Sequence, residues 1–242
     1  MKKRTRIILS VCLTVLLVIG IGSYAYLSDY YHADEVALEA MAYQTDSVQT
    51  EQDGDVIWFV PEDPIAGLIF YPGGKVEHTA YAPLLRACAE QGILCALVRM
   101  PGNLAVLDAN AADGLQQEHP EITTWYIAGH SLGGAMAAGY AAAHEKDYDG
   151  LILLAAHSTK KLTDTPLRVL SVYGSEDGVM NRESYEKNRA NLPADTIEVV
   201  LDGGCHSQFG SYGPQDGDGI PTISSEEQVR QTAEAIAAFV GQ

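Results

Sequence analysis

The sequence predicts an α/β domain whose central sheet is mostly parallel and carries helices on both faces. Apolar runs with strand composition alternate along the chain with stretches of helical periodicity, as in a parallel sheet built with helical crossovers. These runs are near-continuously apolar, which indicates strands buried on both faces. Hydrophobic residues make up 47% of the 242 residues and charged residues 19%, so the chain can form a sizeable core and is not globally disordered.

The N-terminal residues predict a membrane segment. A basic cluster at residues 2–6 precedes the uncharged, apolar residues 7–28, which are numerous enough to cross a bilayer as a helix. The basic cluster lies before the apolar segment, and the acidic residues Asp29 and Asp34 lie after it. This charge asymmetry predicts that the N-terminus is in the cytoplasm and that the rest of the chain is outside. Tyrosines lie where an interfacial aromatic belt is expected, at Tyr24, Tyr26, Tyr30 and Tyr31. We interpret residues 1–28 as a signal anchor.

A cleaved signal peptide is the alternative to an anchor. Ser23 and Ala25 are small residues that fit the positions before a cleavage site after Ala25. The length of the apolar segment and the tyrosine belt favour the uncleaved anchor. The body of the protein is exported in both cases, membrane-anchored in the first and secreted in the second.

Charge excludes one class of partner. The chain carries 15 Lys and Arg against 32 Asp and Glu, a net charge of −17. Four of the basic residues lie within the first six positions, which leaves 11 basic against 32 acidic residues downstream, a charge of −21. Such an acidic body repels phosphate backbones and anionic headgroups, so we expect no nucleic-acid partner.

The cysteines provide neither a disulfide framework nor a metal site. Cys12 lies in the membrane segment, and the remaining three, Cys88, Cys95 and Cys205, are an odd number. Cys88 and Cys95 lie in apolar stretches, where free buried thiols are favoured over a bridge between the two, which stays open. No spacing typical of metal ligands occurs, and we expect no metal and no cofactor.

The chain divides into three segments. Residues 1–28 form the membrane segment, the polar residues 29–54 form a membrane-proximal linker with one helix at 33–43, and residues 55–242 form the α/β domain. Strands of this domain are expected at residues 56–60, 67–71, 93–98, 125–128, 151–154, 167–173 and 197–201. Helices are expected at residues 81–91, 104–118, 132–144, 183–191 and 226–240.

A turn between the strand at 125–128 and the helix at 132–144 carries the pattern G-x-S-x-G. The pattern alone is common, but a strand before it and a helix after it are typical of a nucleophile elbow, which exposes Ser131. Gly129 and Gly133 fit this turn because side chains there would collide as strand and helix approach. His130, the second residue of the elbow, is expected to point away from Ser131.

A serine hydroxyl becomes a strong nucleophile only when a base removes its proton, and the base needs an acid to orient it. Asp177 follows the strand at 167–173 and His206 follows the last predicted strand, in the chain order Ser, Asp, His. Glu176 is an alternative to Asp177, and Asp202 is a weaker one because it shares a turn with His206. We expect Ser131, Asp177 and His206 to form a catalytic triad.

Two further groups of residues are expected around this triad. The N–H of Leu132 and a second N–H from the loop after the strand at 67–71 should form an oxyanion hole, with Gly74 as first choice and Lys75 next. The alternative interpretation is that this loop is an ordinary glycine-rich turn with no role in an oxyanion hole. Pocket residues are expected after strand ends and beside the base: His78, His157, Phe209 and Tyr212.

These motifs, with the loop sequence Y-P-G-G-K-V at residues 71–76, resemble the α/β-hydrolase superfamily, specifically its small esterase and dienelactone-hydrolase-like members. The resemblance covers residues 56–240. It implies an α/β-hydrolase fold and a serine hydrolase that acts through an acyl-enzyme on an ester, thioester or related bond. Many lipases have H-G-G-G where this chain has Y-P-G-G, so their oxyanion arrangement does not carry over.

Loop lengths refine the expected substrate. Residues 154–167 are too few for a helical cap domain, so we expect an open site that hydrolyses short-acyl carboxylic esters without interfacial activation. The long segment 207–224 is interpreted as a pocket wall, with an inert ordered loop as the alternative. The expected function is therefore an extracytoplasmic, membrane-anchored serine hydrolase of small-molecule acyl esters. An acyltransferase or cell-envelope deacylase with the same triad, a peptidase and a catalytically silent tethered binding module are the alternatives.

Overall fold

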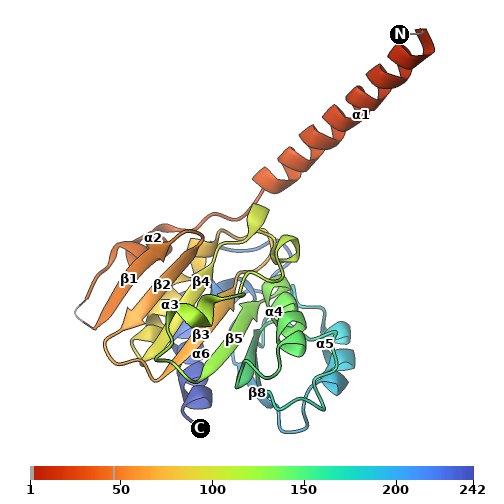
Figure 1. The fold of residues 1–242 in the computed structure, drawn as a ribbon. Helices are drawn as coiled ribbons and strands as arrows, with labels where there is room; N and C mark the ends of the chain where they lie inside the picture. The colour runs from red at the N-terminus through yellow and green to blue at the C-terminus, as the bar shows by residue number, and fades with distance from the viewer. Residues whose placement is uncertain (1–2, 46) are drawn as a thin grey trace. The chain divides into compact units, whose positions relative to one another are not determined.

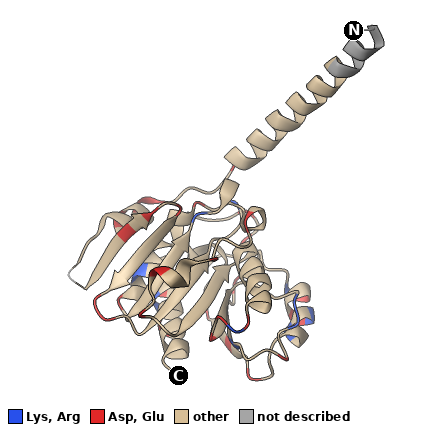
Figure 2. Cartoon of the chain, viewed as in Figure 1, with Lys and Arg blue, Asp and Glu red and all other residues tan. Residues whose placement is uncertain are grey.

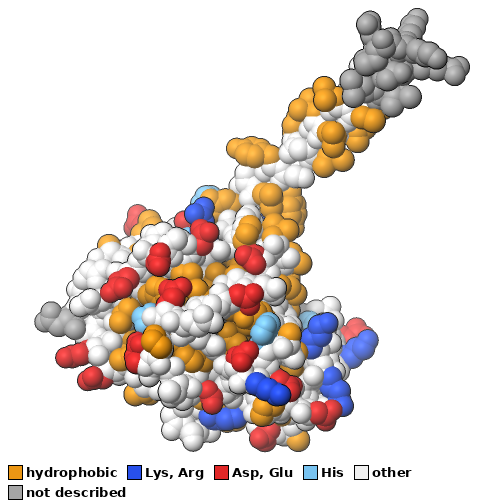
Figure 3. Space-filling view, viewed as in Figure 1, with side chains coloured by type: hydrophobic (Ala, Val, Ile, Leu, Met, Phe, Trp, Pro, Cys, Tyr) orange, Lys and Arg blue, Asp and Glu red, His pale blue; other side chains and the backbone are white. Residues whose placement is uncertain are grey.

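A computed structural model describes residues 3–45 and 47–242, which fall into two compact units, Met1–Tyr30 and Tyr31–Gln242 (Figure 1). The first unit contains helix α1, Lys3–Ser28. Its segment Ser10–Ser28 has a mean hydropathy of 2.0 and is long and apolar enough to cross a membrane, a test that a signal sequence also passes. Its side chains are not buried, and apolar ones line the helix in Figure 3. Lys2, the first residue of the predicted basic cluster, lies outside the described residues.

The second unit contains an eight-stranded sheet in the order β1-β2-β4-β3-β5-β6-β7-β8. The strands are β1 Val48–Asp53, β2 Val56–Pro61, β3 Ala66–Tyr71, β4 Ile93–Val98, β5 Trp125–His130, β6 Gly150–Leu154, β7 Arg168–Gly174 and β8 Ile197–Leu201. The pairs β1/β2 and β2/β4 are antiparallel, and every other pair is parallel. This arrangement confirms the predicted mostly parallel sheet.

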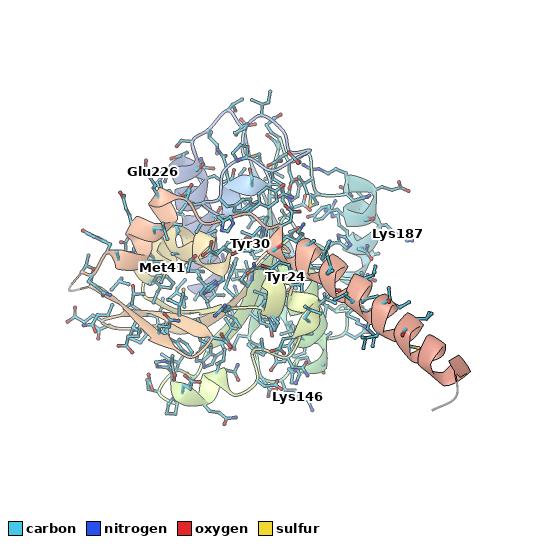
Figure 4. The ribbon with its side chains drawn as sticks, turned by 90° about the horizontal axis from the view of Figure 1, so that it is seen from above. Tyr24, Tyr30, Met41, Lys146, Lys187 and Glu226 are labelled. Carbon is cyan, nitrogen blue, oxygen red and sulfur yellow. The ribbon has the colours of Figure 1, made fainter. Side chains whose placement is uncertain are left out.

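Helices cover both faces of the sheet and create two cores. They are α2 Glu35–Ala42, α3 Ala82–Ala89, α4 Leu132–Ala143, α5 Arg182–Asn188 and α6 Ser225–Val240. Alternate residues of β3 point to opposite faces: Leu68 and Phe70 belong to the core under α3 and α6, whereas Ile69 and Tyr71 belong to the core under α4. Met41 on α2, labelled in Figure 4, packs against the first of these cores.

Residues 29–54, predicted as a linker, instead contribute α2 and the edge strand β1 to the compact unit that begins at Tyr31. The Asp34 carboxylate accepts a hydrogen bond from the N–H of Ala37 and so caps α2. Arg86 on α3 donates to the carbonyl of Ala40 and to the hydroxyl of Thr50, which holds α2 and β1 to the domain. Most of β1 is exposed, and a solvent-facing edge strand has the polar composition of a linker.

The predicted helix at 104–118 is not formed. The structure has two short 3-10 turns there, Ala105–Leu107 and Leu115–Glu118, and a third, Pro101–Asn103, just before them. Gly114 has a φ of 84°, a left-handed conformation that interrupts a right-handed helix. The apolar residues of this segment, although spaced as in a helix, therefore lie on separate short turns and not on one continuous helix.

Figure 2 shows acidic residues spread over many elements of the compact unit, in keeping with its negative charge.

Candidate active site

Ser131 lies at the junction of β5 and α4 in a strained backbone conformation. Its φ is 51° and its ψ −120°, values that a non-glycine residue rarely adopts. Its N–H donates to the carbonyl of Leu154 at 2.9 Å, which fixes the turn to the neighbouring strand. A Cβ on Gly133 would lie 2.2 Å from the carbonyl oxygens of Tyr71 and Pro72, so glycine is required where the elbow passes the loop after β3.

His206 and Asp177 form a buried pair beyond the ends of β8 and β7. The distance from His206 Nδ1 to Asp177 Oδ2 is 2.9 Å, and the two side chains are 1% and 0% exposed. The other carboxylate oxygen, Oδ1, accepts hydrogen bonds from the N–H groups of Val179 and Met180 at 2.9 and 2.7 Å. An ionised carboxylate only accepts, so His206 donates from Nδ1 and presents a bare Nε2.

The Nε2 atom of His206 is buried and has no hydrogen-bond partner in the described part of the chain. It is therefore an unoccupied acceptor, as a general base requires. The alternative acids do not compete for His206: Glu176 is exposed and accepts from the hydroxyl of Ser175, and Asp202 is exposed at the end of β8.

His130 brings the elbow next to the base. Its ring centroid lies 4.5 Å from that of His206. The hydroxyl of Tyr81 accepts from the N–H of Gly73 at 3.0 Å and lies 2.8 Å from His130 Nδ1, so the phenol proton is donated to that nitrogen. Burial, and then the nearby His206, lower the pKa of His130 well below 6.5. His130 is thus a neutral residue that connects the loop after β3 with His206.

The oxyanion-hole candidates have different hydrogen-bond partners. A Cβ on Gly74 would lie 2.8 Å from Cδ2 of Leu132, which places the two residues side by side. Neither of their N–H groups has an acceptor among the backbone hydrogen bonds of the described residues. The N–H of Lys75, in contrast, donates to the carbonyl of Asn103 at 2.8 Å and is not available to an oxyanion. Leu132 and Gly74 therefore remain the candidate donors, and Lys75 does not.

The four predicted pocket residues fall into two groups. Phe209 and Tyr212 belong to the core, 0% and 7% exposed, and the Phe209 ring packs 5.5 Å from that of His130, so they support the site from within. His78 and His157 are half-buried, His78 at the start of the 3-10 helix His78–Tyr81 after β3 and His157 in the loop after β6. Burial lowers the pKa of both, and Arg99 adds to the effect at His78, so both are neutral at pH 7.

Two residues that contact the predicted ones, Tyr81 and Asp218, were not predicted from the sequence. Tyr81 connects Gly73 to His130, and Asp218 accepts hydrogen bonds from the loops of both Asp177 and His206. Neither belongs to a local motif, since their partners lie far away in the sequence. Asp218 lies between two glycines in a loop rich in Gly and Asp, where nothing distinguishes it from Asp216.

The described residues contain no group of three or more His, Cys, Asp or Glu that could hold a metal ion. The cysteines Cys88, Cys95 and Cys205 are buried free thiols.

Comparisons with known proteins agree with this architecture. Residues 67–230 match the alpha/beta hydrolase family. A predicted CIB-like hydrolase from Thermoplasma acidophilum superposes with a TM-score of 0.59 at 15% identity over 79% of this chain and 99% of its own. TT1662 from Thermus thermophilus gives a TM-score of 0.57 at 16% identity over 81% and 99% of the two chains. A comparison with curated proteins finds no match. The family match spans more than half of the sequence, and the chain belongs to the alpha/beta hydrolase family.

Proposed function

We propose that this hydrolase cleaves carboxylic esters with Ser131 as nucleophile, His206 as general base and Asp177 as the orienting acid. The observation that carries the proposal is the buried His206–Asp177 hydrogen bond with its bare Nε2. The His206 ring lies 4.5 Å from that of His130, the residue that precedes Ser131 in the strained turn. Family membership supports a hydrolase, and these residues are those that a serine mechanism requires.

The proposed reaction has two half-reactions. Ser131 Oγ attacks the ester carbonyl carbon while its proton passes to His206 Nε2, and the N–H groups of Leu132 and Gly74 donate to the resulting oxyanion. His206 returns the proton to the leaving alkoxide as the carbon–oxygen bond breaks, which leaves an acyl-enzyme. Water then gives its proton to Nε2 and attacks the acyl carbon. Collapse of this second intermediate releases the carboxylic acid and reprotonates Ser131.

Short-acyl, soluble esters fit the open architecture that we propose. The connection from β6, which ends at Leu154, to β7, which begins at Arg168, contains no helix that could form a cap. Turnover of soluble short-acyl esters should therefore exceed that of emulsified long-chain triglycerides, with no rise in rate at an oil–water interface. A strong preference for the emulsified substrate would contradict this assignment.

For localisation, we propose that α1 is an uncleaved anchor and that the compact unit lies outside the cytoplasm. Support comes from the apolar segment Ser10–Ser28 and the basic residues before it. The mass of the native protein tests cleavage after Ala25. Protease accessibility in intact cells tests the orientation, and protection of the compact unit from external protease would contradict it.

A fluorophosphonate probe tests the proposed function because it labels only an activated serine. The full chain in detergent is compared with Ser131→Ala and His206→Ala, and with Ser184→Ala and His144→Ala as matched controls. We expect labelling of wild type and both controls, and none of the two triad variants. Absence of labelling in folded wild type, or labelling that survives Ser131→Ala, would reject the mechanism.

A further inference from the structure

We propose that Asp218 is a positioning residue that holds the acid loop and the base loop of the triad in register through its carboxylate. The inference rests on the proposed roles of Asp177 and His206. Asp218 lies in the segment after His206, which has no assigned role in the mechanism above.

The Asp218 carboxylate contacts the backbone of both loops. Its Oδ1 accepts from the N–H of Gly178, the residue after Asp177, at 3.2 Å and from the N–H of His206 itself at 3.1 Å. Its Oδ2 accepts from the N–H of Ser207 at 2.8 Å, and Oδ1 also accepts from the N–H of Gly219 at 2.9 Å. One side chain therefore fixes the relative positions of the two residues whose side chains form the 2.9 Å acid–base hydrogen bond.

The loops around Asp218 lie too close together for side chains. A Cβ on Gly178 would lie 2.5 Å from the carbonyl oxygen of Gly217, and a Cβ on Gly219 would lie 1.8 Å from that of Glu176. This close approach lets the short Asp218 side chain reach both backbones at once. A longer side chain would have to displace one of the loops.

The charge of Asp218 gives it a second effect on the base. Burial raises the pKa of its carboxyl group, but the N–H groups of Ser207, Gly178 and His206 together lower it below the usual 3.8, so the group is ionised at neutral pH. Its other titratable neighbours, Cys205 and Tyr212, have raised pKa values, chiefly through burial, and are uncharged.

The imidazole of His206 faces the Asp177 carboxylate and the neutral His130. Asp218 therefore adds a second negative charge that favours the imidazolium formed during catalysis.

The test compares Asp218→Asn with Asp216→Asn in the full chain in detergent. Asp216 lies in the same segment with an exposed side chain, so its variant removes the same charge without removing these hydrogen bonds. For Asp218→Asn we expect kcat on a soluble ester to fall about 10- to 100-fold with KM within about twofold of wild type. The acid limb of kcat/KM should move to lower pH, because His206 loses a nearby negative charge. Asp216→Asn should retain the wild-type kcat and the wild-type position of the acid limb of kcat/KM.

A second variant separates position from charge. Asp218→Glu keeps the charge but moves the carboxylate, so kcat should fall while the acid limb stays in place, and this variant carries the test if the Asn protein does not fold. Hydrogen exchange of peptides that contain Gly178 and Ser207 gives a readout independent of activity, and protection there should fall in Asp218→Asn but not in Asp216→Asn.

Three results would overturn the positioning role: equal kcat for the two Asn variants, a lower melting temperature with unchanged kcat, or unchanged exchange. An inactive wild type that still shows the exchange difference would reject the proposed function and not the loop connection.

Discussion

Single residues determine how the site responds to pH, and His130 gives the clearest case. Its folded pKa lies well below 6.5, through burial first and then through His206, so the folded protein keeps it neutral while the unfolded chain binds a proton below pH 6.5. Stability is therefore lost as the pH falls through 6.5. The loss amounts to about 1.4 kcal/mol of unfolding free energy at pH 5.5.

Denaturant unfolding at pH 7.5 and 5.5 measures this effect. We expect His130→Asn, which keeps an acceptor for the Tyr81 hydroxyl, to lose about 1.4 kcal/mol less than wild type between the two pH values. The groups that face His130 are Tyr81, His206 and Phe209, and all three are present in both proteins. The same pH dependence in both proteins would show that His130 titrates in the folded state.

Residues of this candidate site were predictable from the sequence where a residue's chemistry and its local context coincide. Ser131 was predicted because a short motif lies between a strand and a helix, and Asp177 and His206 were predicted because each follows a strand. Lys75 was chosen for its place in a glycine-rich loop, but its N–H is bound to Asn103, a contact that no local pattern reveals. Asp218 was missed for the same reason, since it acts on backbone far from it in sequence.

At the scale of secondary structure elements, α4 contains two glycines at which substitution by alanine should have opposite effects on stability. A Cβ at Gly133 would meet backbone oxygens at 2.2 Å, whereas a Cβ at Gly139 would meet no atom within 4 Å. We expect Gly133→Ala to lower the unfolding free energy by about 3 kcal/mol and Gly139→Ala to raise it by about 1 kcal/mol through helix propensity. Chemical denaturation of the two variants checks this, and similar effects would mean that the elbow can relax.

Elements were predictable where burial on both faces left a strong apolar signal. The expected strand at 93–98, which is buried at every position, agrees with the structure residue for residue. The edge strand at 197–201 also agrees, because its alternate positions Ile197, Val199 and Leu201 are apolar although the strand is partly exposed. The other predicted strands differ by one or two residues at their ends. The edge strand β1 was not recognised, because its exposed positions carry polar side chains. The segment 104–118 has helical spacing, but spacing does not reveal the left-handed Gly114 that prevents a helix.

At the scale of the whole molecule, the segment just after α1 is part of the hydrolase unit. The N–H of Tyr31 donates to the carbonyl of Lys75 at 2.8 Å, and the N–H of Glu77 donates to the carbonyl of Tyr31 at 2.9 Å. The Tyr31 hydroxyl accepts from the N–H of Asp216 at 3.2 Å. The N–H of Asp34 donates to Ser211 at 2.9 Å. This segment thus connects the glycine-rich loop after β3 with the loop after His206.

Two truncated proteins test that connection. A chain that begins at Asp29 retains these hydrogen bonds and should keep the wild-type rate of fluorophosphonate labelling. A chain that begins at Glu35 loses them and should be less stable by about 2–3 kcal/mol, which lowers the melting temperature by about 5–10 °C and slows labelling. Equal melting temperatures would show that residues 31–34 add nothing to the domain.

The pairing of Tyr31 with the loop after β3 also limits how far the hydrolase unit can move from the end of α1. Only Asp29 and Tyr30 separate the end of α1 at Ser28 from Tyr31, which pairs with Val76 of the hydrolase unit. Two residues span at most about 7 Å, and the complete link to Tyr31 about 10 Å. With α1 held in a bilayer as proposed, the enzyme searches for substrate in two dimensions, and its encounter rate with any molecule in the same membrane depends on surface density and not on bulk concentration.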